Sequence, residues 1–530
     1  MSGAAGLARL IAMSRLARRA SILLAAITLT AGCAPGLSTP PDFATDSGSE
    51  GGATTETSAP PAGPPAIAAP ADDLSWTDCT TRISAAAGVP APAGVKLECA
   101  SFQAPMDPIG GGTGQLSIGA VKASSTSTPT DAGPVVFTTG SDLPSSLQLP
   151  AWLHRSGVDI LAKHPIVAVD RRGMGSSDPI ECRNPADRRD MRDQTQFSSG
   201  NDPVTRLGAI TLTATTDCTD ALANNAAYNN AHAGEDLEKL RSTWDVPALA
   251  LIGVGNGAQV ALSFAGAHPD KVARLVLDSP LPLTIGAEAA AQQALAGAQD
   301  ALDVFAAQCA ASACALGPDP KAAVTALLDD ARADRGPAGM SVAVLVNAII
   351  TALGYPQGDG AENTRRLADA LNAARGGDAG ALTELVRAAE ARTGTDGEFI
   401  NRCSDEFNRP TPDRVRELVV AWGKQYPQFG SVAALNLVKC LNWPTSAEPT
   451  EPKELKVDVL LMGARNNPIV GSEGVAATAA TVINAGATSR RVMWQGVGNG
   501  ASIYSACAMP PLLSYLGEGN LPQTDTFCPA

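Results

Sequence analysis

Residues 249–258 read Leu-Ala-Leu-Ile-Gly-Val-Gly-Asn-Gly-Ala, and their pattern is the most informative about the fold. An apolar run typical of a buried strand leads into a glycine-rich turn, and a helix-like run follows the turn. The pentapeptide Gly-Val-Gly-Asn-Gly at 253–257 occurs again at 496–500, after another strand-like run. Both copies are therefore expected in tight turns that follow strands.

Further apolar runs of strand length alternate with helix-like stretches. They lie at 116–121, 135–138, 166–170 and 272–278, and strand signals return at 457–462 and 491–494. This alternation predicts an α/β fold with a mostly parallel sheet covered by helices. Residues 285–440 are alanine-rich with apolar residues at helical spacing, which predicts an inserted helical cap.

The first 32 residues have the pattern of an export signal. Four arginines precede an apolar run at 22–29, and Ala31-Gly32-Cys33 follows. The run is too short to span a bilayer, which disfavours a transmembrane anchor. Small residues before a cysteine are similar to a bacterial lipobox, which implies cleavage before Cys33 and lipidation of its thiol. The pair Arg18-Arg19 leaves a twin-arginine export signal open.

The net charge and the composition limit the kinds of partner that the protein can bind. Removing the signal, which has four arginines and no acidic residue, takes the formal charge from −14 to −18. This acidity argues against nucleic acid and against electrostatic adhesion to anionic lipid. We expect a signal peptide at 1–32, a flexible Pro/Ser/Thr/Gly-rich tether at 33–73, core segments at 74–282 and 446–530, and the helical cap at 283–445.

Ten cysteines remain after Cys33, and an even number in an exported chain predicts a set of disulfides. A metal cluster is disfavoured because the chain has no C-x-x-C pair and only four histidines, and no cofactor is expected. Counting alone leaves the connectivity open. The simplest prediction pairs neighbours: Cys79–Cys99, Cys182–Cys218, Cys309–Cys314, Cys403–Cys440 and Cys507–Cys528.

Several motifs in order resemble one family. They are D-R-R-G-M-G-S-S at 170–177, the helix-like stretch 231–241, L-D-S-P at 277–280, C-S-D at 403–405, C-L-N-W-P at 440–444 and the stretch 515–528. From about residue 75 to its end the chain resembles exported α/β-hydrolases similar to tripeptidyl aminopeptidases and proline iminopeptidases. The resemblance implies an α/β-hydrolase fold with a helical cap, a TAP-like carboxyl-terminal part and a peptidase or esterase ancestry.

The positions that the resemblance implies for catalysis are all substituted. The elbow at 253–257 has Gly255 where G-x-S-x-G carries serine. Asn467, beside Asn466, stands at the aspartate position and Asn499 at the histidine position. The oxyanion loop contains Gly140-Ser141-Asp142, and an aspartate there would oppose a developing negative charge.

These substitutions predict an inactive protein that binds or scaffolds. Its partner would be an unidentified envelope protein, or a small ligand in the former active-site cleft, with the lipidated Cys33 holding the chain at the outer face of the cytoplasmic membrane. A second interpretation is an active secreted serine-type peptidase or esterase that uses unrecognised residues. We expect the four histidines, His154, His164, His232 and His268, to be surface or capping residues.

A third interpretation concerns the same glycines. Residues 253–258 also fit G-x-G-x-x-A between a strand and a helix, and Asp278 ends the next strand. This pattern is the dinucleotide fingerprint, with Asp278 at the ribose. Its mid-sheet position and the export signal argue against this interpretation.

Overall fold

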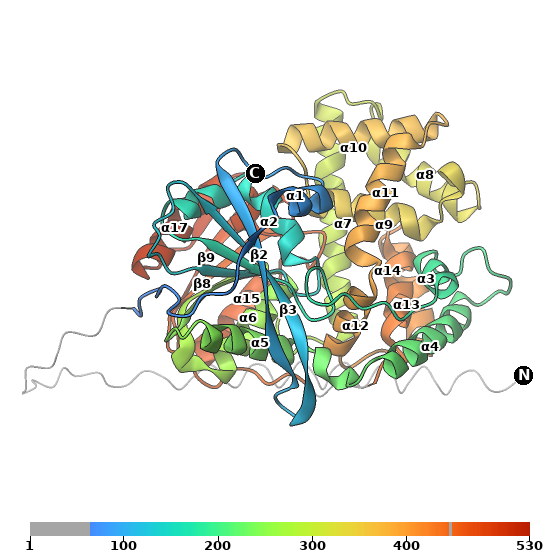
Figure 1. The fold of residues 1–530 in the computed structure, drawn as a ribbon. Helices are drawn as coiled ribbons and strands as arrows, with labels where there is room; N and C mark the ends of the chain where they lie inside the picture. The colour runs from blue at the N-terminus through green and yellow to red at the C-terminus, as the bar shows by residue number, and fades with distance from the viewer. Residues whose placement is uncertain (1–63, 445–447) are drawn as a thin grey trace, which may run out of the picture. The chain divides into compact units, whose positions relative to one another are not determined.

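The computed structural model describes residues 64–444 and 448–530. Within these ranges ten strands form one sheet in the order β1-β2-β3-β5-β4-β6-β7-β8-β9-β10 (Figure 1). The strands are β1 (Thr77–Asp78), β2 (Val95–Asp107), β3 (Gly112–Ser125), β4 (Val135–Thr138), β5 (Ile166–Val169), β6 (Leu249–Val254), β7 (Val272–Asp278), β8 (Val459–Asn466), β9 (Ser489–Val497) and β10 (Thr526–Cys528).

The sheet is parallel from β5 to β10. Strands β4 to β7 consist entirely of buried residues, which is why each appears in the sequence as an apolar run. The predicted α/β fold with a mostly parallel sheet is confirmed.

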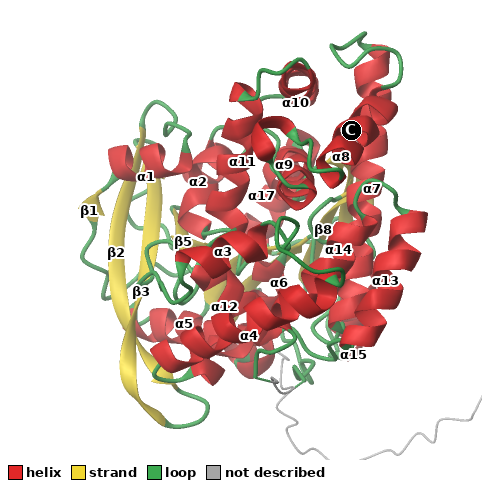
Figure 2. Cartoon of the chain, turned by 90° about the vertical axis from the view of Figure 1, so that its right-hand side faces the viewer, coloured by secondary structure: helices red, strands yellow, loops and turns green. Residues whose placement is uncertain are grey.

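Helices cover both faces of the sheet (Figure 2). Phe137 and Ile252 point into the same apolar cluster as helices α1 (Thr80–Ala87), α2 (Ser145–Leu153), α16 (Ala501–Tyr504) and α17 (Met509–Glu518). The alternate residues Val136 and Leu251 face the opposite cluster, with α5 (Asn230–Thr243), α6 (Asn256–Ala267) and α15 (Gly474–Asn484). Strand side chains alternate between faces, so each strand contributes to both layers.

A helical cap connects β7 to β8. Its helices are α7 (Ala287–Ala311), α8 (Pro320–Arg332), α9 (Val342–Gly354), α10 (Gly360–Arg375), α11 (Gly380–Thr393), α12 (Asp396–Asp405), α13 (Pro412–Gln425), α14 (Gly430–Asn436) and the short 3-10 helix η5 (Leu437–Cys440). Phe305, Ile349 and Leu371 belong to its apolar core.

Two helices outside the predicted cap segment join this core. Helices α3 (Pro185–Arg192) and α4 (Pro203–Ala221) follow β5, yet Met191 and Leu207 are buried in the cap cluster. Figure 1 shows α3 and α4 beside α13, away from the sheet. The predicted core segment 74–282 includes these helices, but their buried side chains lie in the apolar core of the cap. Their contacts are with residues about 200 positions later, which local periodicity does not reveal.

The β2–β3 hairpin was only partly predicted, since just 116–121 was marked as a strand. These long strands pair antiparallel from Val95–Ser125 to Asp107–Gly112, and β3 pairs antiparallel with β5. Strand β2 mixes buried and exposed residues, so it lacks the continuous apolar run of the central strands.

The ten cysteines of the described part form five disulfides, which confirms the prediction that the protein contains disulfide bonds. Nearest neighbours pair, as Cys79–Cys99, Cys182–Cys218, Cys309–Cys314, Cys403–Cys440 and Cys507–Cys528.

The amino-terminal end of the described part packs on the core. Arg274 Nη1 donates to Pro65 O at 2.8 Å, and Ala71 N donates to Trp244 O at 2.9 Å. The predicted tether therefore does not extend to residue 73. The signal at 1–32, Cys33 and residues 34–63 lie outside the described residues. No helix in the described ranges has the length and apolar character needed to cross a membrane.

Candidate functional site

Gly255 forms the sharp turn between β6 and α6. Its φ of 59° and ψ of −124° are unfavourable for a residue with a Cβ, and glycine adopts them without that cost. Its amide donates to Asp278 O at 2.9 Å, which ties the turn to the end of β7. The sequence therefore folds as an elbow whose central residue offers no side chain.

Asn467 and Asn499 meet beside this turn. Asn467 follows β8 and Asn499 follows β9, and Asn467 Nδ2 donates to Asn499 Oδ1 at 3.0 Å. A Cβ built on Gly255 would lie 3.4 Å from Asn499 Nδ2. The structure thus brings together the three positions that the sequence resemblance identified, although Gly255 lies more than 200 residues before the two asparagines.

Asp142 occupies the space in front of Gly255. Asn256 N donates to Asp142 Oδ2 at 2.8 Å, and a Cβ built on Gly255 would lie 2.0 Å from that same oxygen. Burial raises the pKa of Asp142 to about 7, and the hydrogen bond from Asn256 opposes that rise. We call Gly255, Asn467, Asn499 and Asp142 the remnant site.

The cap lies directly on the remnant site. Asn499 N donates to Gly354 O at 2.8 Å, and Asn499 Nδ2 donates to Tyr355 Oη at 3.4 Å, both at the end of α9. Asn467 is fully buried and Asn499 is 2% exposed. Burial and the nearby Asp142 charge raise the pKa of Tyr355 above its usual range. Contacts with the protein itself therefore satisfy the two asparagines.

Comparisons with known proteins show what this chain is similar to. A family model described as TAP-like protein matches residues 426–528. The chain is 24% identical over 495 residues to "Carboxylesterase B" of Mycobacterium tuberculosis, which covers 86% of this chain and 90% of that protein. It is 31% identical over 164 residues to the "Serine protease Hip1" of the same species, covering 30% of this chain and only 31% of the protease.

Residues 426–528 thus resemble TAP-like proteins, and the sheet and cap have the arrangement of an α/β-hydrolase fold. Among solved structures, esterase E22 matches at 12% identity with a TM-score of 0.38, covering 80% of this chain and 99% of that one. A putative aryl esterase from Burkholderia cenocepacia matches at 11% identity with a TM-score of 0.37, covering 78% and 97%.

A buried arginine joins the sheet to the cap. Arg171, just after β5, donates to both carboxylate oxygens of Asp405 on α12, at 2.6 and 2.9 Å. It also donates to Asn256 Oδ1 at 2.7 Å, and Ser141 N donates to that same oxygen at 2.8 Å. In the sequence, Arg171 and Asp405 stand out only as members of two separate family-like motifs. Their pairing was missed because nothing local connects residues 234 positions apart.

Asp278 has a structural role. It is fully buried, and its carboxylate accepts from Ala501 N, Ser502 N and Ser502 Oγ at 3.0, 2.7 and 2.6 Å. Both carboxylate oxygens are therefore engaged, and neither is presented to a ribose. This arrangement does not support the dinucleotide interpretation.

The four histidines all lie elsewhere. His232 Nε2 is 3.0 Å from Asp107 Oδ1, and His268 Nε2 is 2.9 Å from Glu235 Oε1. His164 Nδ1 is 2.9 Å from Gly133 O, while His154 contacts Pro90 O. Each imidazole is engaged away from the remnant site.

The Asp142 carboxyl makes stability depend on pH. Its pKa is about 7 in the folded protein against an ordinary 3.8, so between these values the folded state holds a proton that the unfolded chain has lost. Raising the pH through this window therefore destabilises the fold, by about 1 kcal/mol per pH unit. Asp142→Asn removes the effect, so we expect its stability relative to the native chain to increase from pH 4 to pH 7.

Urea unfolding at pH 5, 6 and 8 measures this difference. The exposed Asp131→Asn is the matched control, and we expect its curve to run parallel to that of the native chain. Parallel curves for Asp142→Asn and the native chain would contradict the raised pKa of Asp142.

Proposed function

We propose that this protein is a non-catalytic α/β-hydrolase-fold protein that acts by binding a ligand or partner in the cell envelope. The observation that carries the proposal is the Asp142 carboxylate. It accepts a hydrogen bond from the Asn256 amide and fills the space in which a side chain at Gly255 would begin.

The chemistry of ester and peptide hydrolysis supports this proposal. A serine-type hydrolase needs a nucleophile, a base oriented by a carboxylate, and free amide donors for the oxyanion. Gly255 has no nucleophile, and the amides of Asn467 and Asn499 do not accept a proton at neutral pH. In an elbow, the amide after the nucleophile is an oxyanion donor, and here Asn256 N already donates to a carboxylate.

The location is part of the proposal. Residues 1–32 would direct export, and lipidation of Cys33 would hold the mature chain on the outer face of the cytoplasmic membrane. Two observations support export: the signal pattern and the five disulfides, which persist in oxidising compartments. One acyl chain binds membranes only marginally, and two or more anchor stably, as lipidation at both the thiol and the new amino terminus would provide.

Labelling with a fluorophosphonate tests catalytic inactivity. We expect neither the native chain nor Gly255→Ser to be labelled stoichiometrically, because none of the four histidines faces the elbow and Asp142 Oδ2 lies 2.0 Å from the new Cβ. The fourfold variant Gly255→Ser/Asp142→Gly/Asn467→Asp/Asn499→His restores each missing group, and we expect it to be labelled.

Two results of that assay would refute the proposal. Labelling of the native chain would establish an active hydrolase that uses other residues. Labelling of Gly255→Ser at the rate of the fourfold variant would mean that Asn499 does not occupy the position of the base. Gly255→Ala is the control for changes in folding caused by the new Cβ.

Lipidation is tested separately in a bacterium that processes lipoproteins. We expect the native chain to incorporate radiolabelled palmitate and to partition into Triton X-114. Cys33→Ala should lose both properties while its disulfides still form. Retention of Cys33→Ala in the detergent phase would refute anchoring through this residue.

A further inference from the structure

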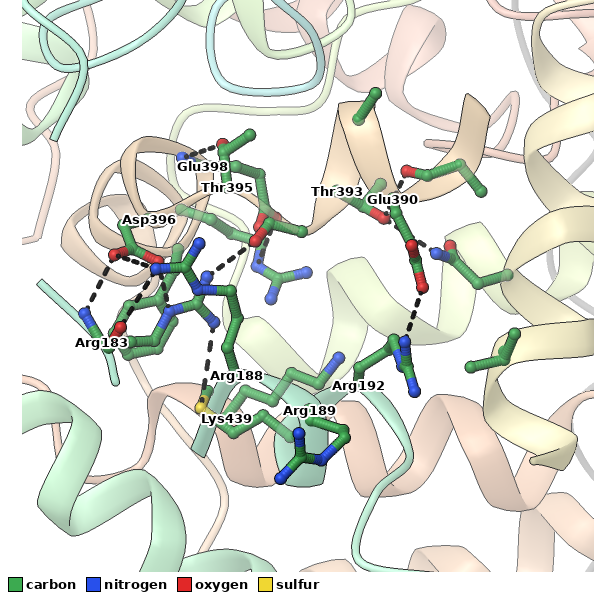
Figure 3. A pocket seen from close by; sticks show the side chains of 18 of the residues that line it. Arg183, Arg188, Arg189, Arg192, Glu390, Thr393, Thr395, Asp396, Glu398 and Lys439 are labelled. Carbon is green, nitrogen blue, oxygen red and sulfur yellow. Dashed lines mark hydrogen bonds and ion pairs between the residues drawn. The ribbon is translucent and has the colours of Figure 1, made fainter. Parts of the chain in front are cut away.

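A cavity of about 820 Å³ lies within the cap, apart from the remnant site. Its lining residues come from α3, α9, α11, α12, α14, η5 and the loop after β5, and Figure 3 shows the charged side chains among them. None of the four residues of the remnant site lines it. Its volume is within the range of about 300 to 1,000 Å³ that is typical of small-molecule sites.

The cavity is basic although the protein is acidic. Seven cationic side chains and four acidic ones line it, an excess of three positive charges, whereas the whole chain has a formal charge of −14. Figure 3 shows Arg188, Arg189 and Arg192 of α3 beside Lys439 of η5. We call this space the basic cavity.

Three of the four acids are already paired with an arginine. Arg183 Nε lies 2.7 Å from Asp396 Oδ1, and Arg192 Nη1 lies 3.0 Å from Glu390 Oε1. Arg402 Nε lies 3.3 Å from Glu398 Oε1. These carboxylates therefore do not neutralise the remaining cations.

Two cations of the basic cavity, Arg189 and Lys439, have no partner among the described residues, and of these Arg189 is exposed whereas Lys439 is partly buried. Within residues 64–444 and 448–530, the ammonium of Lys439 forms no hydrogen bond or ion pair. The side chain is partly buried, and burial, with the nearby Arg402 charge, lowers the pKa of Lys439 to about 8. Cys440 follows it and is held by the disulfide to Cys403, so the backbone of Lys439 is fixed. A desolvated ammonium without a counter-ion is unfavourable, and an anion placed beside it removes that cost.

One wall of the basic cavity is apolar. Val344 and Ile350 come from α9, Val386 from α11 and Phe399 from α12. Val344 and Val386 belong to a small apolar cluster of their own, separate from the main cap core. The basic cavity thus combines cations on α3 and η5 with a hydrocarbon surface on α9 and α11.

We propose that the basic cavity binds an amphipathic anion, whose carboxylate or phosphate contacts Lys439 and whose alkyl part packs on Val344, Ile350 and Val386. This inference rests on the proposed binding function and gives it a ligand class and a place. A free fatty acid and a phosphorylated lipid fragment share this chemistry, and the test distinguishes them.

Isothermal titration calorimetry on the mature chain tests the proposal, with Cys33→Ala keeping the protein in solution without detergent. The probes are decanoate, decyl phosphate, inorganic phosphate and decanol. We expect at least one of the two alkyl anions to bind at micromolar concentration, and the tighter one identifies the head group. Inorganic phosphate and decanol should each bind at least tenfold more weakly, because inorganic phosphate lacks the alkyl chain and decanol lacks the negative charge.

Two variants locate the binding. Lys439→Met should lower the affinity for the alkyl anion at least tenfold. Lys424→Met removes an exposed lysine on α13 outside the basic cavity and should leave that affinity unchanged. Ile350→Thr should lower the affinity for decanoate or decyl phosphate but not the affinity for inorganic phosphate. Unfolding midpoints equal to that of the parent chain establish that the variants fold.

The proposal is overturned if no alkyl anion binds, if decanol or inorganic phosphate binds as tightly, or if Lys439→Met keeps full affinity. None of these results affects the fluorophosphonate assay, so the failure of this inference and the failure of the proposed inactivity are distinguishable.

Discussion

The guanidinium of Arg171 connects the two halves of this molecule. It lies where β5 ends, and its two ion-pairing hydrogen bonds to Asp405 on α12 hold the cap against the sheet. Arg171 is 4% exposed, so the pair is desolvated. Removing one partner of such a pair leaves an uncompensated charge and costs on the order of 3–5 kcal/mol.

The remnant site depends on the same contacts between Arg171, the sheet and the cap. Arg171 and Ser141 N both donate to Asn256 Oδ1, which fixes the residue after Gly255 and the oxyanion loop together. Asn256 N is thereby directed at the Asp142 carboxylate. A cap held by Arg171 also places Gly354 and Tyr355 over Asn499. The contacts that orient substrate and oxyanion in an active enzyme are here satisfied within the protein.

The sequence predicted what short-range patterns encode. Strands β4 to β7 were predicted because each is an apolar run, and the cap helices because their apolar residues recur with helical spacing. Gly255, Asn467 and Asn499 were identified by resemblance, and the structure places them together.

Long-range contacts could not be predicted in this way. The aspartate at 142 was recognised as unsuited to an oxyanion loop, but its position against Gly255 depends on how two distant turns meet. Helices α3 and α4 join the cap by packing against residues about 200 positions later in the chain. The basic cavity unites Arg188 and Lys439, which are 251 positions apart in the chain, so no local signal marks it.

A crystal structure of the mature chain after incubation with a fluorophosphonate tests the central claim most directly. The account predicts the Asp142 carboxylate at hydrogen-bond distance from Asn256 N, with no phosphonyl group on any side chain. A phosphonyl group bonded to a serine beside Asn256 N, with Asp142 turned away, would contradict it.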